Sequence, residues 1–201
     1  MAKRRHGNLH GNVPDRAAAC LLIIDMINPM TFRGAERMAR PALAAAKRLA
    51  ALKRRLKAAG VPAVYVNDNF GKWRSDFRAL VSHCLERSCR GRPLAEALRP
   101  DGEDYFILKP KHSAFYATPL SLLLTSLGAR RLILTGIAAN SCILQTAADA
   151  YMREFELIVP SDCTASILPK DTRTALAHVR RMFKADTRPS RRLRITAHRE
   201  R

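Results

Sequence analysis

The stretch Leu132–Tyr151, "LILTGIAANSCILQTAADAY", decides the fold, because it joins a strand pattern directly to a helix pattern. A cysteine lies at the junction. The run that begins the stretch is apolar and ends in Thr135-Gly136, which predicts a buried strand. Small residues follow as far as Ser141, and an alanine-rich helical pattern then begins at Cys142. A buried strand that leads into a helix is typical of a parallel sheet, because parallel strands need a crossover connection.

The same alternation of apolar runs and helical patterns continues along the chain. Besides 129–136, strands are expected at 18–25, 61–68, 104–109 and 155–162, and the pattern leaves room for a short sixth strand near 184–188. Helices are expected at 34–60, 75–88, 118–128, 140–154 and 169–183, with Ser75 and Thr118 as N-caps and Gly60 at a C-terminus. Strands that are apolar on both faces and separated by helices predict an α/β fold, with helices covering both sides of a parallel sheet.

Length and composition predict a single globular domain. The chain has 201 residues, 47% of them hydrophobic and 26% charged, and no apolar run reaches the roughly 18 residues that would suggest a membrane span. The basic start of the chain lacks the apolar core of a secretory signal, and five cysteines are an odd count for a disulfide framework. We therefore expect a cytoplasmic protein with free thiols, a domain over 16–189, and basic tails at 1–15 and 190–201.

The net charge of +19 raises the question of nucleic-acid binding. A good part of this charge lies in the two tails, and much of the rest falls in helical patterns where Lys and Arg cover a solvated face. Contact with polyanions through counterion release would then be non-specific. The sequence contains no zinc-finger spacing, RNA-binding aromatic motif or dimeric basic region, so specific recognition of nucleic acid is not expected.

Three reactive side chains fall where predicted strands end, which is the edge at which open parallel sheets bind ligands. Asp25 follows the first strand, Lys109 ends the third, and Cys142 begins the helix of the opening stretch. A helix N-terminus lowers the pKa of a thiol from about 8.5, and its amides can hold an oxyanion, so Cys142 is a candidate nucleophile. The alternative is that Cys142 is a small buried apolar residue. The remaining cysteines are expected to be of that kind: Cys20, Cys84, Cys89 and Cys163.

Asp25 and Lys109 each have an ordinary interpretation beside the catalytic one. Asp25 is either a turn-capping residue or a base that takes the thiol proton and later activates water. Lys109 is either a surface lysine or a cation that stabilises the ionised thiol and the oxyanion. The spacing alone leaves Lys111 open for that second role.

Three separated segments agree with one known family. "CLLIIDMINPMTF" from Cys20, "ILKPKHSAFYATPL" from Ile107 and "LILTGIAANSCILQTAADAYMREFELIVPSDCTAS" from Leu132 resemble the isochorismatase-like cysteine hydrolase superfamily. The resemblance covers about residues 18–166. It implies a three-layer α/β/α, Rossmann-like fold with a six-stranded parallel sheet. It also implies a homo-oligomer, either a dimer or a tetramer.

The resemblance assigns roles to the reactive residues. It implies a catalytic triad in which Asp25 is the base, Lys109 is the lysine before the "SAF" element, and Cys142 is the nucleophile that forms a thioester. It further implies that the backbone amides of Ala138 and Cys142 hold the oxyanion, and that the Ile137–Ala138 peptide bond is cis.

The residues around the predicted triad are assigned less directly. Four side chains are candidates for lining the substrate pocket, with ordinary packing as the alternative for each: Asn28, Phe70, Trp73 and Phe115. His112, in "KPKHSAF", is expected to be a hydrogen-bonded loop residue rather than an acid or base.

Departures from the family pattern narrow the expected reaction. Nicotinamidase members carry a metal-binding Asp and histidines after the second strand, whereas this segment reads "VNDNFGKWRSDF", with Asp68 but no histidine before His83. We therefore expect neither a metal nor another cofactor. Members that cleave the vinyl ether of isochorismate lack the cysteine, so Cys142 argues against that reaction. What remains is hydrolysis of a C–N bond in a small amide, ureido or carbamoyl substrate.

Two other classes of function remain open. A non-catalytic relative would bind a partner or a polyanion through its basic surface, and its Cys142 would be unreactive. A redox sensor would oxidise Cys142 to a sulfenic acid, although the sequence lacks a C-x-x-C pair.

Overall fold

One six-stranded sheet forms the centre of the molecule in the computed structural model, which describes residues 15–71, 73 and 76–195. The strands are β1 (Ala19–Ile24), β2 (Ala63–Asp68), β3 (Tyr105–Lys109), β4 (Arg131–Ile137), β5 (Glu156–Ile158) and β6 (Thr164–Ala165). The helices are α1 (Ala35–Ala58), α2 (Phe77–Cys84), α3 (Arg92–Ala97), α4 (Leu120–Leu127), α5 (Leu144–Met152) and α6 (Pro169–Met182). A π-helical turn, Ala139–Ile143, leads into α5, and a 3-10 turn lies at Ser190–Arg192. Within the described ranges, the helices include none long and apolar enough to span a bilayer.

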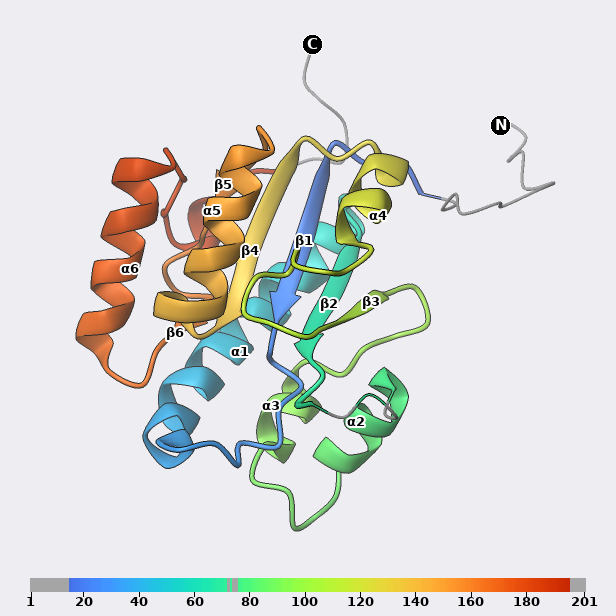
Figure 1. Cartoon of the computed structure of the whole chain (residues 1–201), viewed down its shortest axis with the longest axis vertical. Coiled ribbons are helices and arrows are strands. Elements are labelled where there is room, and N and C mark those ends of the chain that lie inside the picture. Colours follow the sequence, from blue (N-terminus) through green and yellow to red (C-terminus); the bar gives the residue numbers. More distant parts are fainter. Residues whose placement is uncertain (1–14, 72, 74–75, 196–201) are drawn as a thin grey trace, which may run out of the picture.

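The strand order creates a reversal in the middle of the sheet. All pairs are parallel, the order is β3-β2-β1-β4-β5, and β6 pairs with β4 (Figure 1). The chain runs from β1 outward through β2 to β3, and then crosses back to β4 on the other side of β1. The carboxyl ends of β1 and β4 therefore flank the switch point at which sheets of this kind bind ligands.

Two hydrophobic cores explain why the strands are apolar on both faces. Successive residues of β1 alternate between them: Leu21 and Ile23 belong to the core under α1 and α3, and Leu22 and Ile24 to the core under α4 and α5. Figure 1 shows the sheet between these helical layers. The predicted three-layer α/β/α fold with a six-stranded parallel sheet is confirmed.

Two short elements differ from the expectation. The sixth strand is β6, which pairs with the last two residues of β4, whereas Asp186 in the expected segment makes a single bridge to Ile158. A strand of two residues is too short to leave a hydrophobic pattern. Helix α3 is also unexpected, because its six residues begin with Arg92-Pro93 and give no helical period.

The helix starts differ in detail from the predicted ones. The expected cap Ser75 lies outside the described residues, and the side chain of Asp76 accepts the N–H of Ala79 at 2.7 Å at the start of α2. Thr118 accepts the N–H of Leu120 at 3.3 Å, although Pro119 occupies the capping position of α4. The helix expected at 140–154 begins instead as the π-helical turn.

Beyond residue 189, where the C-terminal tail was expected to begin, the chain still packs against the rest of the domain. Ser190 and Leu193 are buried, and Leu193 belongs to the core under α1. The backbone N–H and the hydroxyl of Ser190 donate to the carboxylate of Asp162 at 2.7 and 2.9 Å. The packed domain therefore extends at least to Leu193, while residues 1–14 of the expected N-terminal tail lie outside the described part.

Strands β1 and β4 approach each other closely at Gly136. Gly136 has a φ of 114°, and a Cβ at this position would lie 2.0 Å from the carbonyl oxygen of Ile24. Ile24 and Gly136 are register partners, so the oxygen cannot move away without disturbing the ladder at the switch point. Only glycine meets both the backbone and the space requirement here.

Replacing this glycine should destabilise the protein strongly. We expect Gly136→Ala to lower the free energy of unfolding by about 2–4 kcal/mol, because the methyl group overlaps a backbone oxygen and the φ value disfavours a side chain. The midpoint of urea unfolding, followed by circular dichroism, measures this change. Gly102→Ala is the control, because its added Cβ meets nothing within 4 Å. Equal midpoints for the two variants would contradict the explanation.

Candidate active site

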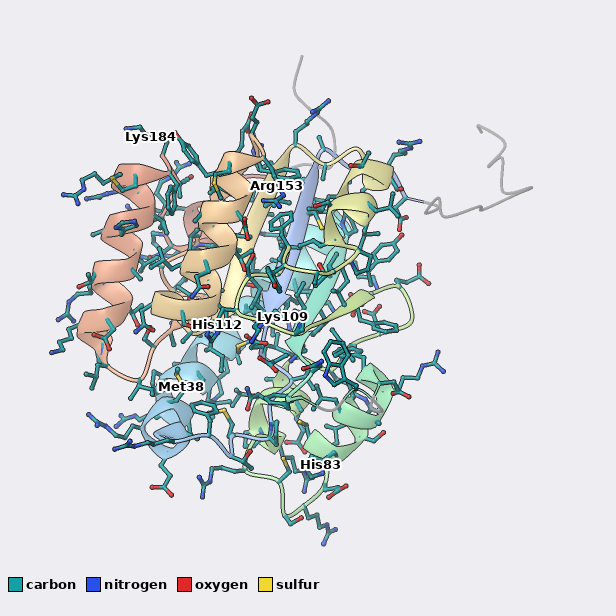
Figure 2. The ribbon with its side chains drawn as sticks, in the orientation of Figure 1. Met38, His83, Lys109, His112, Arg153 and Lys184 are labelled. Carbon is teal, nitrogen blue, oxygen red and sulfur yellow. The ribbon has the colours of Figure 1, made fainter. Side chains whose placement is uncertain are left out.

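The three reactive side chains predicted from the sequence meet at the carboxyl ends of the strands. Asp25 directly follows β1, Lys109 is the last residue of β3, and Cys142 lies in the π-helical turn after β4. Lys109 lies at this end of the sheet in Figure 2, close to the start of α5. Short irregular turns of this type occur often at functional sites.

Lys109 is the centre of the cluster. Its side chain is fully buried, and its ammonium group lies 3.0 Å from Asp25 Oδ2, 3.5 Å from Cys142 Sγ and 3.7 Å from Asp68 Oδ2. It also donates to the backbone carbonyl of Lys111 at 3.2 Å. Burial lowers the pKa of the Lys109 ammonium, but the neighbouring Asp25 and Cys142 outweigh it and the net pKa is raised. The group therefore stays positively charged.

Asp25 is held in place by both of its carboxylate oxygens. Oδ1 accepts the backbone N–H of Asp68 at 2.7 Å, and Oδ2 faces Lys109. The residue has a φ of 56°, a left-handed conformation that turns the chain sharply after β1. Burial raises the pKa of this carboxyl group, and the opposing effect of Lys109 does not cancel the shift. A carboxylate with a raised pKa is a better proton acceptor near neutral pH.

Cys142 and Asp25 both contact the Lys109 ammonium, and the charge of Asp25 acts on the nearby thiol. Burial, followed by the charge of Asp25, raises the pKa of the Cys142 thiol to about 12, against the lowering effect of Lys109. This differs from the pKa decrease expected from a helix N-terminus. The physical reason is that the thiol is 9% exposed and shares its site with a carboxylate. The resting thiol is therefore protonated, and a nucleophilic attack by it requires a base.

The π-helical turn that contains Cys142 begins with small residues. Ala138 precedes the π-helical turn, and the N–H groups of Ser141 and Ile143 donate to its carbonyl oxygen at 3.0 and 3.2 Å. The Ile137–Ala138 peptide bond is cis, the geometry that the resemblance implies. Asn140 anchors the turn to the segment after β6, because its carboxamide oxygen accepts the hydroxyl of Ser166 at 2.9 Å.

A set of polar contacts that sequence reasoning missed ties the loop after Lys109 to the helix after Cys142. The N–H of Ala114 donates to the hydroxyl of the fully buried Thr146 at 3.0 Å, and the hydroxyl of Ser113 donates to Asp149. Arg153 donates to the same Asp149 carboxylate at 2.9 Å. The "SAF" element therefore fixes the position of Lys109 relative to Cys142. In the sequence, Thr146 and Asp149 are only polar residues in a helical pattern, and nothing singles them out.

The candidates for lining the pocket have different environments. Phe70 is 40% exposed and Trp73 is 80% exposed, both on the loop after β2 that begins beside Asp68. Phe115 is buried in the core under α4 and α5, 6.1 Å from the ring of Phe155 and beneath the guanidinium of Arg153. These are packing contacts, the alternative interpretation that the sequence left open for Phe115.

Asn28 lies in a tightly packed loop. It is 5% exposed, and its carboxamide oxygen accepts the N–H of Met30 at 2.8 Å. The carboxamide of Asn67 donates to the carbonyl of Ile27 at 2.7 Å from the end of β2. From the other side, Gly91 packs so closely that a Cβ there would lie 1.7 Å from the carbonyl oxygen of Asn28. The path of this loop is therefore fixed from both sides.

The two basic residues between Lys109 and the "SAF" element are both exposed. Lys111 contributes only its backbone carbonyl to the cluster, through the bond from Lys109, so the geometry selects Lys109 between the two lysines. His112 Nδ1 lies 3.7 Å from Cys142 Sγ and 3.4 Å from the hydroxyl of Ser141. His112 is thus a hydrogen-bonded loop residue, as expected, but one that contacts the thiol.

The described side chains do not form a cluster of the kind that binds a metal ion. In the part of the chain that the structure describes, groups of three or more His, Cys, Asp and Glu side chains that could hold a metal ion do not occur. Asp68, which the sequence placed in the segment where nicotinamidases bind metal, is instead a second carboxylate beside the Lys109 ammonium.

The chain resembles known proteins along most of its length. The family profile described as "Isochorismatase domain" matches residues 19–188. The uncharacterized isochorismatase family protein YaaI of Bacillus subtilis is 39% identical over 171 residues, which are 85% of this chain and 93% of YaaI. The ureidoacrylate amidohydrolase RutB of Methylorubrum extorquens is 45% identical over 71 residues, which are 35% of this chain and 29% of RutB.

Solved structures give the same assignment for the fold. N-carbamoylsarcosine amidase from Thermoplasma acidophilum superimposes with a TM-score of 0.67 at 24% identity, covering 88% of this chain and 99% of that one. The family match and the YaaI similarity each span most of the domain that carries Asp25, Lys109 and Cys142. The chain belongs to the isochorismatase family.

Proposed function

We propose that the protein is a cysteine hydrolase that cleaves a C–N bond in a small amide, ureido or carbamoyl substrate. The observation that carries the proposal is the chain of contacts from Asp25 through Lys109 to the Cys142 thiol, with separations of 3.0 and 3.5 Å. Nucleophile, base and a fixed cation within contact distance are what acyl transfer requires. The names of two relatives, an amidohydrolase and an amidase, are consistent with this chemistry.

The first half of the proposed reaction makes a thioester. Asp25 takes the proton of the Cys142 thiol while the sulfur bonds to the substrate carbonyl carbon. The backbone amides of Ala138 and Cys142 hold the oxyanion of the tetrahedral intermediate. Asp25 then gives the proton to the leaving nitrogen, the C–N bond breaks, and an amine or ammonia departs.

The electrostatics of the site support proton transfer during attack rather than a preformed thiolate. The thiol pKa of about 12 leaves the sulfur protonated at neutral pH. Burial keeps the Asp25 pKa above its ordinary range, and Lys109 stabilises negative charge whether it resides on Asp25 or on the sulfur. The cluster holds one proton between two acceptors that share one ammonium group, so the proton can move without changing the total charge.

The proposed substrate is small, and it enters from the side of Phe70 and Trp73. These exposed aromatic side chains follow Asp68, which borders the Lys109 cluster. Asn28 is proposed as a further contact through the part of its carboxamide not bonded to Met30. The homo-oligomer and the cytoplasmic location remain predictions, and light scattering of the purified protein measures the first of them.

Alkylation of Cys142 tests the proposed base without requiring a known substrate. We expect Asp25→Asn to make iodoacetamide labelling of Cys142 follow the titration of the thiol alone, without a neutral plateau or an acidic limb, because the carboxamide can neither accept the thiol proton nor titrate. Peptide mass spectrometry reads each cysteine separately, with the half-buried Cys89 as an internal reference.

The matched control is Asp68→Asn, which changes the more distant carboxylate beside Lys109 and leaves Asp25 in place. It should have a much smaller effect on the labelling rate. If Asp25→Asn labels like the wild type, Asp25 is not the base. If Cys142 stays unlabelled in the wild type, the result favours a non-catalytic protein.

The pH dependence of labelling follows from the directions of the pKa shifts. Because burial raises the pKa of Asp25, its carboxylate becomes protonated on acidification at a pH above the ordinary value of about 3.9. The labelling rate of Cys142 should therefore fall as the pH decreases through that raised pKa, hold a plateau at neutral pH, and rise again toward pH 12. Asp25→Asn should remove the plateau and the acidic limb. A single rise centred near the ordinary thiol pKa of about 8.5 would contradict this assignment.

A further inference from the structure

His112 is a solvent-exposed residue in contact with the Cys142 thiol, in contrast to the buried charges of Asp25 and Lys109. Its Nδ1 lies 3.7 Å from Cys142 Sγ, and the residue is exposed, whereas Asp25 is 5% exposed and Lys109 is fully buried. Lys109 ends β3 and His112 lies in the loop that follows, and the two lie near each other at the end of the sheet in Figure 2. The sulfur is thus contacted by the buried Lys109 ammonium, which Asp25 also contacts, and by an imidazole that reaches solvent.

The second half of a thioester mechanism needs a water molecule and a base for it. Asp25 is 5% exposed, and its two carboxylate oxygens face the backbone of Asp68 and the Lys109 ammonium, so water from solvent reaches it less readily than it reaches the exposed His112. His112 contacts the Cys142 sulfur and also lines a neighbouring cavity of about 470 Å³ that is open to solvent, so water can reach the imidazole beside the acylated sulfur. Other residues around this cavity are Lys111, Tyr116, Gln145, Asp149 and Met152. The cavity is large enough to hold water beside the imidazole.

We propose that His112 is the base of the second half-reaction, an inference that rests on the proposed function. Nδ1 takes a proton from water as the water oxygen bonds to the acyl carbon of the Cys142 thioester. The C–S bond then breaks, the acid product leaves, and the proton on Nδ1 passes to the sulfur 3.7 Å away, which restores the thiol. No oxidant or other co-reactant is needed.

The chemistry of imidazole fits this step. Nδ1 lies 3.4 Å from the Ser141 hydroxyl, which can donate to it, and the tautomer with its proton on Nε2 leaves Nδ1 as the acceptor that this hydrogen bond needs. In that tautomer Nδ1 carries an electron pair that can take a proton. Contacts of catalytic groups are commonly longer in the free enzyme than in the reacting complex. In this scheme Asp25 serves acylation and His112 serves deacylation.

An activated ester separates the two half-reactions. p-Nitrophenyl acetate acylates a thiol with a leaving group that needs no proton, so a burst of p-nitrophenolate reports acylation and the later steady rate reports deacylation. In His112→Gln we expect the burst to be unchanged and the steady rate to fall by about 10²-fold or more. Acetylated Cys142 should then accumulate and be seen by peptide mass. In His112→Ala, added imidazole should restore part of the steady rate.

The controls separate this inference from the proposed function. Cys142→Ala removes the burst and measures background ester hydrolysis, and His178→Gln makes the same substitution at an exposed histidine on α6. If His112→Gln deacylates as fast as the wild type, or loses the burst, the role of His112 is overturned while the thioester mechanism stands. If the wild type gives no burst that depends on Cys142, the proposed function itself fails.

Discussion

The fully buried ammonium group of Lys109 is the constraint on which the rest of the site depends. An isolated buried charge is strongly destabilising, so this one requires counter-charges and hydrogen-bond acceptors around it. They come from the ends of β1 and β2, from the backbone of Lys111 and from the π-helical turn after β4. A single charge therefore links the ends of four segments that are distant in the sequence. The parallel sheet makes this possible, because the carboxyl ends of its strands meet at one edge.

The same charge cluster explains why the thiol behaves differently from a cysteine at an ordinary helix N-terminus. The effect of backbone amides on an anion is modest, typically about 0.3–1 kcal/mol at exposed positions. Burial beside a carboxylate acts in the opposite direction and outweighs it at Cys142. Reactivity at neutral pH would then depend on a proton acceptor in contact with the sulfur, not on a stable thiolate. This makes the placement of Asp25 and His112 around the sulfur more important than the helix itself.

Sequence patterns predicted what has a strong periodic signal. The nearly continuous apolar strands and the long helices gave the layered fold, and the strand-end rule led to Asp25, Lys109 and Cys142. Strand β6 and helix α3 were not predictable in this way, because two residues and six residues are too short to show a period. The contacts of Thr146 and Asp149 with the "SAF" element join two segments about thirty residues apart and exist only once both are folded. Burial of Phe115 likewise depends on its neighbours in space rather than in sequence.

The close packing of Gly91 against the carbonyl of Asn28 has a consequence for how this scaffold could acquire new substrates. The loop after β1 is held between Gly91 and the carboxamide of Asn67, so neither insertions nor larger side chains at its start can be absorbed locally. The loop that bears Phe70 and Trp73 carries exposed side chains, so changes of side chain there displace little of the packed structure. Variation among relatives with different specificities should therefore concentrate in the second loop. The loop after β1 and the α3 segment packed against it should change only together, since a change in one requires a matching change in the other.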